Sequence, residues 1–177
     1  PEQPFSQTPV AGIALAALVA LFAVLQIWIF RWGVITPDTV EQYRQALTGQ
    51  YQDWHPPITA WLWRMLLHIH GGSAPLLVLD CALYWLGLGL TAEALRRRGQ
   101  LPLGLGVIAV GLLPIPFGQM GSILKDSLLS GCLIAATGIL AFHHLLDRRI
   151  GWQAVMGVAV LLVVAAATRF NAVFAVA

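Results

Sequence analysis

The sequence is poor in charged residues. Only 10% of its 177 residues are Asp, Glu, Lys or Arg, whereas 58% are hydrophobic and the mean hydropathy is +0.76. A soluble globular domain carries about a quarter charged residues. This shortage excludes a disordered chain and an ordinary cytosolic enzyme. The formal net charge of +2 gives no reason to expect a nucleic-acid partner.

Several signatures of soluble proteins are also missing. The two cysteines, Cys81 and Cys132, lie inside apolar runs and show no framework spacing, so we expect small buried thiols and no structural disulfide. There is no CxxC motif, no Gly-rich phosphate loop after a strand, and no repeat of fixed period. His68 and His70 are two residues apart and would not share a helix face, so a histidine metal site is not favoured.

Long apolar runs are abundant and predict a polytopic membrane protein. A helix needs about 20 mostly apolar residues to cross a bilayer. We predict an all-α transmembrane helical bundle in one domain, with about five spans and a large first outer loop at 31–73. The chain lacks an initiator Met and stops inside an apolar run, so we interpret it as the N-terminal part of a longer protein. The predicted spans are 10–30, 74–95, 101–117, 122–146 and 152–177.

Basic residues between the runs suggest an orientation. Arg96, Arg97 and Arg98 separate the second and third runs, and Arg148 and Arg149 separate the fourth and fifth. Short loops rich in Lys and Arg stay in the cytoplasm. We therefore predict an integral membrane protein with the first loop facing outward.

The first outer loop is expected to carry interfacial helices. A Thr-Pro pair at 36–37 indicates a helix start and Gly49 a stop. The Trp-rich stretch 58–69 predicts a second helix, too short and too polar for a confident span. The apolar face of the first helix would be formed by Val40, Tyr43 and Leu47.

Polar residues form five clusters, and four of them are expected at the outer face. A rise of 1.5 Å per residue places Arg169 about 25 Å above the cytoplasmic end of the last span, and Asp80 about 9 Å below the outer face. Polar groups inside membranes are costly and tend to line functional cavities. A hydrated outward pocket is therefore predicted. The clusters are Asp38 with Glu41; 53–57; Asp80; Lys125 with Asp126; and Arg169 to Asn171.

Two members of these clusters also have purely structural interpretations. Asp38 could cap the first outer helix, with Glu41 completing a capping box. Thr36 competes for the capping position, because Pro37 favours the first helical position. His55 precedes two prolines and could simply belong to a surface turn.

The cationic residues have alternatives as well. Asp126 suits the positive N-terminal end of a helix dipole, whereas Lys125 does not. We therefore expect Lys125 to face an anionic partner, either an acid elsewhere in the chain or a phosphate. Alternatively, Lys125 extends to lipid headgroups, and Arg169 forms an ion pair with Asp126 or Asp80.

These patterns together resemble the GT-C type glycosyltransferases, which are integral membrane enzymes that use polyprenyl-phosphate-linked sugars. The resemblance extends over most of the chain, from about Val10 to Asn171. The resemblance rests on the order and spacing of the motifs more than on any single motif. The motifs are Pro37-Asp38-Thr39, Gly49-Gln50-Tyr51, Asp53-Trp54-His55-Pro56-Pro57, Ile123-Leu124-Lys125-Asp126 and Thr168-Arg169-Phe170-Asn171.

The resemblance implies an enzyme of the cell envelope that moves a sugar from a polyprenyl-phosphate donor to an unknown acceptor on the outer face, with inversion. Asp38 matches the catalytic acid of the first outer loop. Many relatives carry a second acid where this chain has Thr39, so a divalent metal is left open and no nucleotide cofactor is implied. Membrane lipid is the other expected partner, and the resemblance implies a bacterial inner or plasma membrane. Donor or phosphate binding is assigned to His55, Lys125 and Arg169, and support to Glu41, Asp53, Asp126, Asn171 and Asp80.

Two other functions compete with this hypothesis. An ion- or proton-coupled transporter could use Asp80, and it predicts polar residues distributed through the membrane to both sides. A non-catalytic membrane subunit would have no reason to present acids and bases to one pocket. The clustering of polar residues at one face favours the glycosyltransferase.

Overall fold

The computed structural model describes residues 8–31, 33–52 and 56–169. Within them the chain is helical, and its only extended pairing is an isolated parallel bridge between Val34 and Ser122. The prediction of an all-α fold is confirmed. The helices are α1 (Pro9–Ile29), α2 (Pro37–Thr48), α3 (Ile58–Leu66), α4 (Ala74–Arg97), α5 (Leu101–Gly111), α6 (Pro114–Met120), α7 (Lys125–Leu145) and α8 (Trp152–Thr168).

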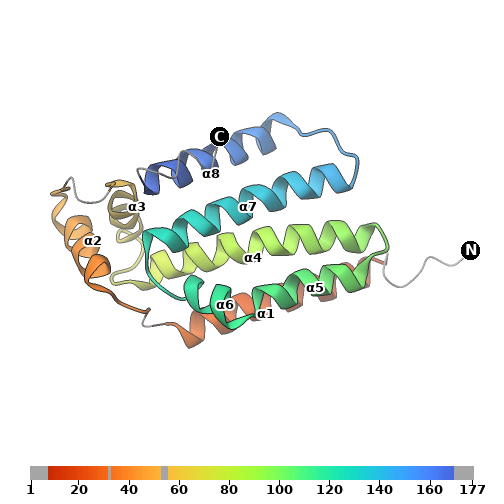
Figure 1. Cartoon of the computed structure of the whole chain (residues 1–177), viewed down its shortest axis with the longest axis horizontal. Coiled ribbons are helices and arrows are strands. Elements are labelled where there is room, and N and C mark those ends of the chain that lie inside the picture. The colour runs from red at the N-terminus through yellow and green to blue at the C-terminus, as the bar shows by residue number, and fades with distance from the viewer. Residues whose placement is uncertain (1–7, 32, 53–55, 170–177) are drawn as a thin grey trace, which may run out of the picture.

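The helices form a bundle around α4. Figure 1 shows α8, α7 and α4 side by side, with α5 next to α4 and α1 behind α5. The short helices α2 and α3 lie at one end of the bundle, beside the starts of α4 and α7 (Figure 1). The loops that follow α4 and α7 both lie at the opposite end, as predicted for the two arginine-rich loops. We call these the α2 end and the basic end.

Three helices, α1, α4 and α7, are long and apolar enough to cross a membrane. The pair α5 and α6 passes the same test together but is bent by 61°. Helix α8 is apolar and has 17 residues, so it is shorter than a span. A membrane protein is therefore supported with three or four spans in the described residues, while a fifth span stays a prediction.

The segment 101–117, predicted as one span, is broken in two. Helix α5 ends at Gly111 and α6 begins at Pro114. A proline has no N–H to continue the hydrogen-bond ladder. The hydroxyl of Tyr84 in α4 donates to the carbonyl oxygen of Gly111 at 2.9 Å, which satisfies an acceptor released by the break.

Small residues let α4 and α7 approach closely. A Cβ on Gly138 would lie 2.3 Å from the carbonyl oxygen of Gly87, and a Cβ on Gly87 would lie 2.2 Å from that of Ile134. Membrane helices associate through such backbone contacts, because lipid removes the hydrophobic drive between them. These glycines set the distance between the two central helices.

One buried amide links three helices. Gln26, fully buried in α1, donates to the carbonyl oxygen of Phe117 in α6 at 2.7 Å. Its Oε1 accepts from the indole N–H of Trp85 in α4 at 2.6 Å. The strongly polar residue of the first apolar run is therefore satisfied inside the bundle.

The two helices predicted in the first outer loop are present as α2 and α3. Helix α2 follows Thr36 and stops before Gly49, which has a left-handed φ of 73°. The guanidinium of Arg64 in α3 donates to the carbonyl oxygens of Ala46 and Leu47 at 3.2 and 3.4 Å, so α3 caps the C-terminal end of α2. This contact fixes the two short helices against each other.

Candidate active site

A short pairing of two loops fixes the start of α2. The amide of Ile123 donates to the carbonyl oxygen of Val34, and the amide of Val34 donates to that of Gly121, both at 3.4 Å. Gly33 has a φ of 69°, and the side chain of Ile123 fills the space in which a Cβ would lie. The chain before α2 is thus held against the chain before α7.

A buried side-chain hydrogen bond strengthens this attachment. The hydroxyl of Thr39, in the first turn of α2, donates to the carbonyl oxygen of Ile123 at 2.8 Å. Thr39 is 2% exposed, so the bond is shielded from water. The residue after Asp38 therefore anchors α2, and Asp38 is brought towards the first residues of α7.

The cap of α2 is Thr36. Its hydroxyl accepts from the amide of Thr39 at 3.2 Å, and its own amide donates to the Thr39 hydroxyl at 3.1 Å, which completes a capping box. The alternative in which Asp38 caps the helix with Glu41 is wrong. Asp38 instead lies in the first turn, where the positive end of the helix dipole favours a carboxylate.

Asp38 and Lys125 meet between α2 and α7. The Nζ of Lys125 lies 3.9 Å from the Oδ2 of Asp38. Lys125 is largely buried, with 16% of its side chain exposed, whereas half of the Asp38 side chain is exposed. Asp38 is thus an anionic partner of the kind expected for a lysine at a helix start. At 3.9 Å the contact is an ion pair that is longer than a hydrogen bond.

Asp126 and Arg169 form the second pair at the same helix start. The Nη2 of Arg169 donates to the Oδ2 of Asp126 at 2.9 Å, and its Nε lies 2.6 Å from the Oδ1. Of the two acids considered for Arg169, the structure selects Asp126 over Asp80. This bidentate pair joins the residue after α8 to the first turn of α7. Two acids and two bases therefore surround the beginning of α7.

The α7 start has no side-chain cap of its own. Its capping residue, Leu124, offers no acceptor, and the acid in the first turn is Asp126. The unsatisfied N–H groups and dipole of such a terminus favour an anion. A phosphate near Lys125 would therefore gain from both the ammonium and the helix end.

Glu41 is engaged within α2. Its carboxylate accepts from Arg44 at 2.7 and 3.0 Å and from the Nε2 of Gln45 at 3.2 Å. The Glu41 carboxylate raises the pKa of Arg44 above its usual value. Glu41 therefore contributes to the exposed side of α2, and its supporting role at the site stays a prediction.

Asp80 lies in the bundle interior, as expected. Its side chain is fully buried in α4, and neither carboxylate oxygen has a hydrogen-bond partner within the described residues. No group of three metal-binding side chains occurs in the part of the chain that the structure describes. The predicted contributions of Asp53, His55 and Asn171 fall outside the described residues.

Sequence reasoning missed two residues that build this site. Thr39 was read only as the place of a missing acid, yet it holds α2 to the α7 start. A threonine three residues after Thr36 was a weak signal, because the capping-box pattern has Glu or Gln at that position, although a hydroxyl can make the same reciprocal hydrogen bond. Arg64 gave no such signal, because its contact with α2 depends on how α3 folds back.

Comparison with protein-family models, with curated proteins and with solved structures gave no match. The function is therefore argued from the chemistry of the site.

Proposed function

We propose that this protein is a membrane glycosyltransferase that moves a sugar from a polyprenyl-phosphate donor to an acceptor at the α2 end of the bundle. The observation that carries the proposal is the 3.9 Å contact between Asp38 and Lys125, in segments far apart in the sequence. A proton acceptor beside a cation, at the end of an apolar bundle, suits a reaction at the membrane surface. The resemblance to GT-C enzymes points to the same reaction.

The proposed reaction is a single displacement. The acceptor hydroxyl attacks the anomeric carbon, and its proton passes to the Asp38 carboxylate. The bond between the anomeric carbon and the phosphate oxygen breaks, and the polyprenyl phosphate leaves with the electron pair. Lys125 and Arg169 supply fixed positive charge for that developing anion. One displacement inverts the configuration at the sugar.

The surroundings suit an amphipathic donor. An apolar groove of about 460 Å³ lies at the start of α4, next to the end of α3. Leu66, Ile69, Val78 and Leu79 are among the residues that line it. In α2, Val40 and Leu47 are 58% and 57% exposed, as expected for a helix lying on a membrane. A polyprenyl tail would find apolar surface here, at the same end of the bundle as the ion pairs.

An assay of sugar transfer in the full-length protein tests the proposal. The probes are polyprenyl phosphates that carry a radiolabelled hexose or pentose. Asp38→Asn keeps the size of the side chain but removes its proton-accepting carboxylate. We expect transfer to fall by roughly 10²–10⁴-fold with donor binding retained. Lys125→Ala should weaken donor binding and turnover together.

A matched control separates catalysis from general loss of charge. Asp147 lies at the basic end in a left-handed conformation, with a φ of 50°, which asparagine adopts readily. Asp147→Asn should therefore transfer sugar at the wild-type rate. Near-normal transfer by Asp38→Asn would sink the assignment of the base.

Asp80 supports a second candidate, an ion- or proton-coupled transporter. A fully buried carboxyl group without a partner in the described residues is a feature of intramembrane proton sites. This candidate predicts that the protein, reconstituted in vesicles, dissipates an imposed pH gradient. Asp80→Asn would abolish that flux, whereas Asp38→Asn would leave it unchanged.

A further inference from the structure

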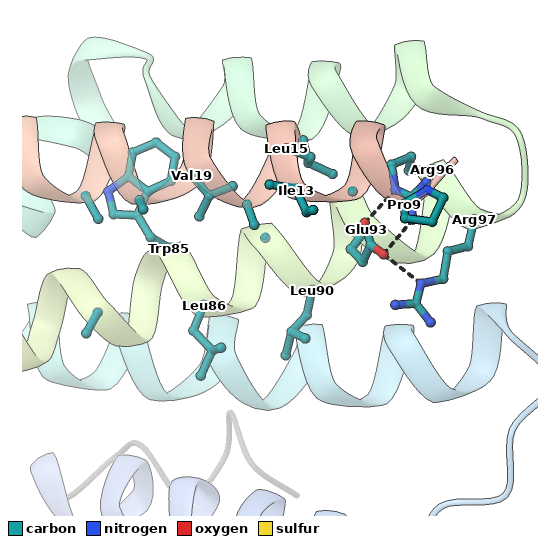
Figure 2. Close-up of a pocket in the computed structure, with 16 residues that line it drawn as sticks. Pro9, Ile13, Leu15, Val19, Trp85, Leu86, Leu90, Glu93, Arg96 and Arg97 are labelled. Carbon is teal, nitrogen blue, oxygen red and sulfur yellow. Dashed lines mark hydrogen bonds and ion pairs between the residues drawn. The ribbon is translucent and has the colours of Figure 1, made fainter. Parts of the chain in front are cut away.

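A groove of about 710 Å³ runs between α1 and α4, apart from the candidate active site (Figure 2). Small side chains from both helices line it, among them Gly12, Ala16 and Ala20 of α1 and Ala82 and Gly89 of α4. Because these residues project little, the two helices leave an open apolar channel towards the lipid.

The groove extends over about one leaflet. It begins at Pro9 and reaches Ala23 and Trp85. The rise of an α-helix gives about 21 Å between Pro9 and Ala23. Trp85 stacks on Phe22 with ring centroids 5.7 Å apart. This wide aromatic pair lies at the end of the groove that is nearest the middle of the membrane. A hydrocarbon core is about 30 Å thick, so the groove stops near the middle of the membrane.

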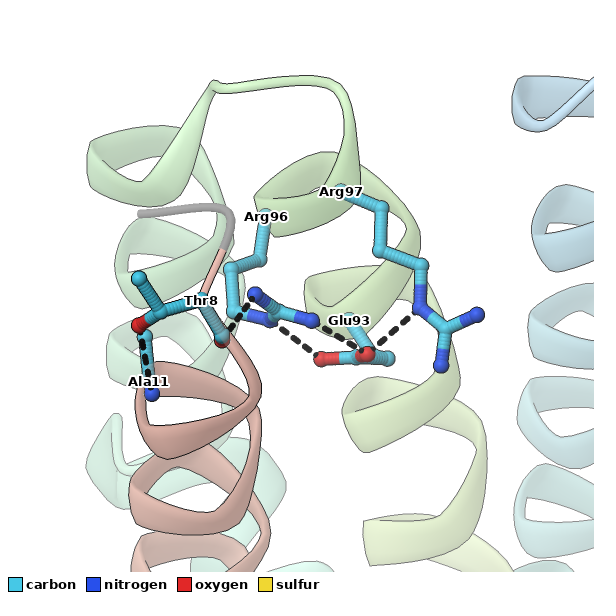
Figure 3. A network of polar contacts seen from close by, with 5 residues as sticks. All are labelled: Thr8, Ala11, Glu93, Arg96 and Arg97. Carbon is cyan, nitrogen blue, oxygen red and sulfur yellow. Dashed lines mark hydrogen bonds and ion pairs between the residues drawn. The ribbon is translucent and has the colours of Figure 1, made fainter. Parts of the chain in front are cut away.

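A charged cluster lies at the end of the groove that is nearest the membrane surface, which is the basic end of the bundle. The Oε1 of Glu93 accepts from the Nε of Arg97 at 2.6 Å and from the Nη2 of Arg96 at 2.8 Å (Figure 3). Arg96 also donates to the carbonyl oxygen of Thr8 at 3.1 Å. Arg96 is therefore committed to protein groups on both helices.

Arg97 has hydrogen-bond donors that Glu93 does not use. It uses its Nε for Glu93, and Figure 3 marks no contact of its two terminal nitrogens. Within the described residues these terminal nitrogens make no hydrogen bond. Arg148 approaches from the loop after α7. The guanidinium carbon of Arg97 lies 5.4 Å from the Phe142 ring centre, and that of Arg148 lies 5.8 Å from it. Two cations at one ring favour an anion nearby.

The basic end as a whole carries excess positive charge. Within the described residues of this end, five arginines stand against two carboxylates, which gives a net charge of +3. Anionic headgroups bind basic sites between membrane helices, and arginine binds phosphate with two parallel hydrogen bonds. The residues counted are Arg96, Arg97, Arg98, Arg148, Arg149, Glu93 and Asp147.

We propose that this groove binds an anionic glycerophospholipid of the adjacent leaflet, with one acyl chain along α1 and α4 and the phosphate on Arg97. A helix of a second copy fits less well. The groove is an open channel about 21 Å long, which is shorter than the roughly 30 Å that a spanning helix covers. A spanning helix would also need a groove that continues past Trp85.

Photolabelling in vesicles tests the proposal. The probe is phosphatidylglycerol with a diazirine on one acyl chain, present in trace amounts in phosphatidylcholine vesicles that hold the 177-residue chain. We expect labelled peptides from 9–23 and 82–97. Unlabelled phosphatidylglycerol should compete about fivefold better than added phosphatidylcholine, which is the order expected for one cation at a membrane surface.

Paired variants identify the binding residues. Ala16→Trp fills the groove and should abolish the labelling, whereas Ala17→Trp, exposed on α1 but outside the groove lining, should not. Arg97→Gln should remove the preference for phosphatidylglycerol, and Arg149→Gln should keep it. Equal competition by both lipids, or unchanged labelling in Ala16→Trp, would overturn the proposal. Cross-links between two copies of the chain that Ala16→Trp removes would identify a second copy as the occupant instead.

Discussion

The attachment of α2 to the α7 start should depend on the hydroxyl of Thr39. Thr39→Val keeps the branched shape but removes the donor to the Ile123 carbonyl and the acceptor for the Thr36 amide. A buried polar group left without its partner costs about 1–3 kcal/mol. The Ile123 carbonyl is buried but the Thr36 amide only half-buried, so the two losses together should weaken the docking of α2 by about 2–4 kcal/mol. Because Asp38 is in the same turn, its contact with Lys125 should loosen as well.

Amide hydrogen exchange measures this docking directly, because exchange reports local opening. A loss of 2–4 kcal/mol corresponds to roughly 30- to 900-fold faster exchange in residues 37–48. Thr48→Val is the matched control, since the exposed Thr48 hydroxyl donates to the Arg44 carbonyl and accepts from the Gln50 amide, both at the end of α2. Unchanged protection in Thr39→Val, or an equal effect in Thr48→Val, would refute the idea that this hydroxyl holds the site together.

Three further substitutions test the bundle, with the free energy of unfolding measured by denaturation in mixed micelles. Gln26→Leu leaves the Trp85 indole N–H and the Phe117 carbonyl unpaired and should lower it by about 1–3 kcal/mol; no change would contradict the linking role of the amide. Gly138→Leu should lower it by about 3 kcal/mol or disrupt the bundle, because α4 has no room for a side chain there; a neutral effect would contradict the close approach. Asp80→Leu removes a buried carboxyl group without a partner in the described residues and should raise it by about 2–3 kcal/mol, whereas a loss would mean that Asp80 has a stabilising partner.

The sequence was sufficient for α2, because local chemistry sets its ends, whereas α3 ends at Leu66, before the predicted residue 69. The Thr-Pro pair at 36–37 and Gly49 act within one turn of the chain, and α2 begins and ends at these signals. The apolar runs likewise predicted the long helices. They did not reveal the break between α5 and α6. Pro114 was a local signal for it, but its stabilisation by Tyr84 is a tertiary contact.

The candidate site was only partly predictable. The sequence indicated that Lys125 needs an anionic partner, but it could not choose Asp38, since that choice depends on the pairing of Val34 with Ser122. For Arg169 the sequence left two acids possible, Asp126 and Asp80, and the geometry at the end of α8 selects Asp126. Which residues pair over long distances in the sequence depends on how the helices pack. Local residue patterns specify that packing only weakly.

The two ends of the bundle carry equal numbers of basic residues, but these residues do different things. Five of the ten Lys and Arg residues lie at each end. At the α2 end, Lys125 and Arg169 meet carboxylates, and Arg64 binds the carbonyls of α2.

At the basic end, Arg97 keeps two nitrogens without hydrogen bonds in the described residues, and Arg148 stacks on Phe142. Orientation in a membrane responds to cations in short loops near the ends of spans. The arginines of the loops after α4 and α7 meet that condition most directly, which is why we propose that the basic end faces the cytoplasm. In this orientation the ion pairs of the α2 end face outward. Under the proposed function, the phosphate of the lipid-linked sugar replaces the carboxylate partner of Lys125 and of Arg169.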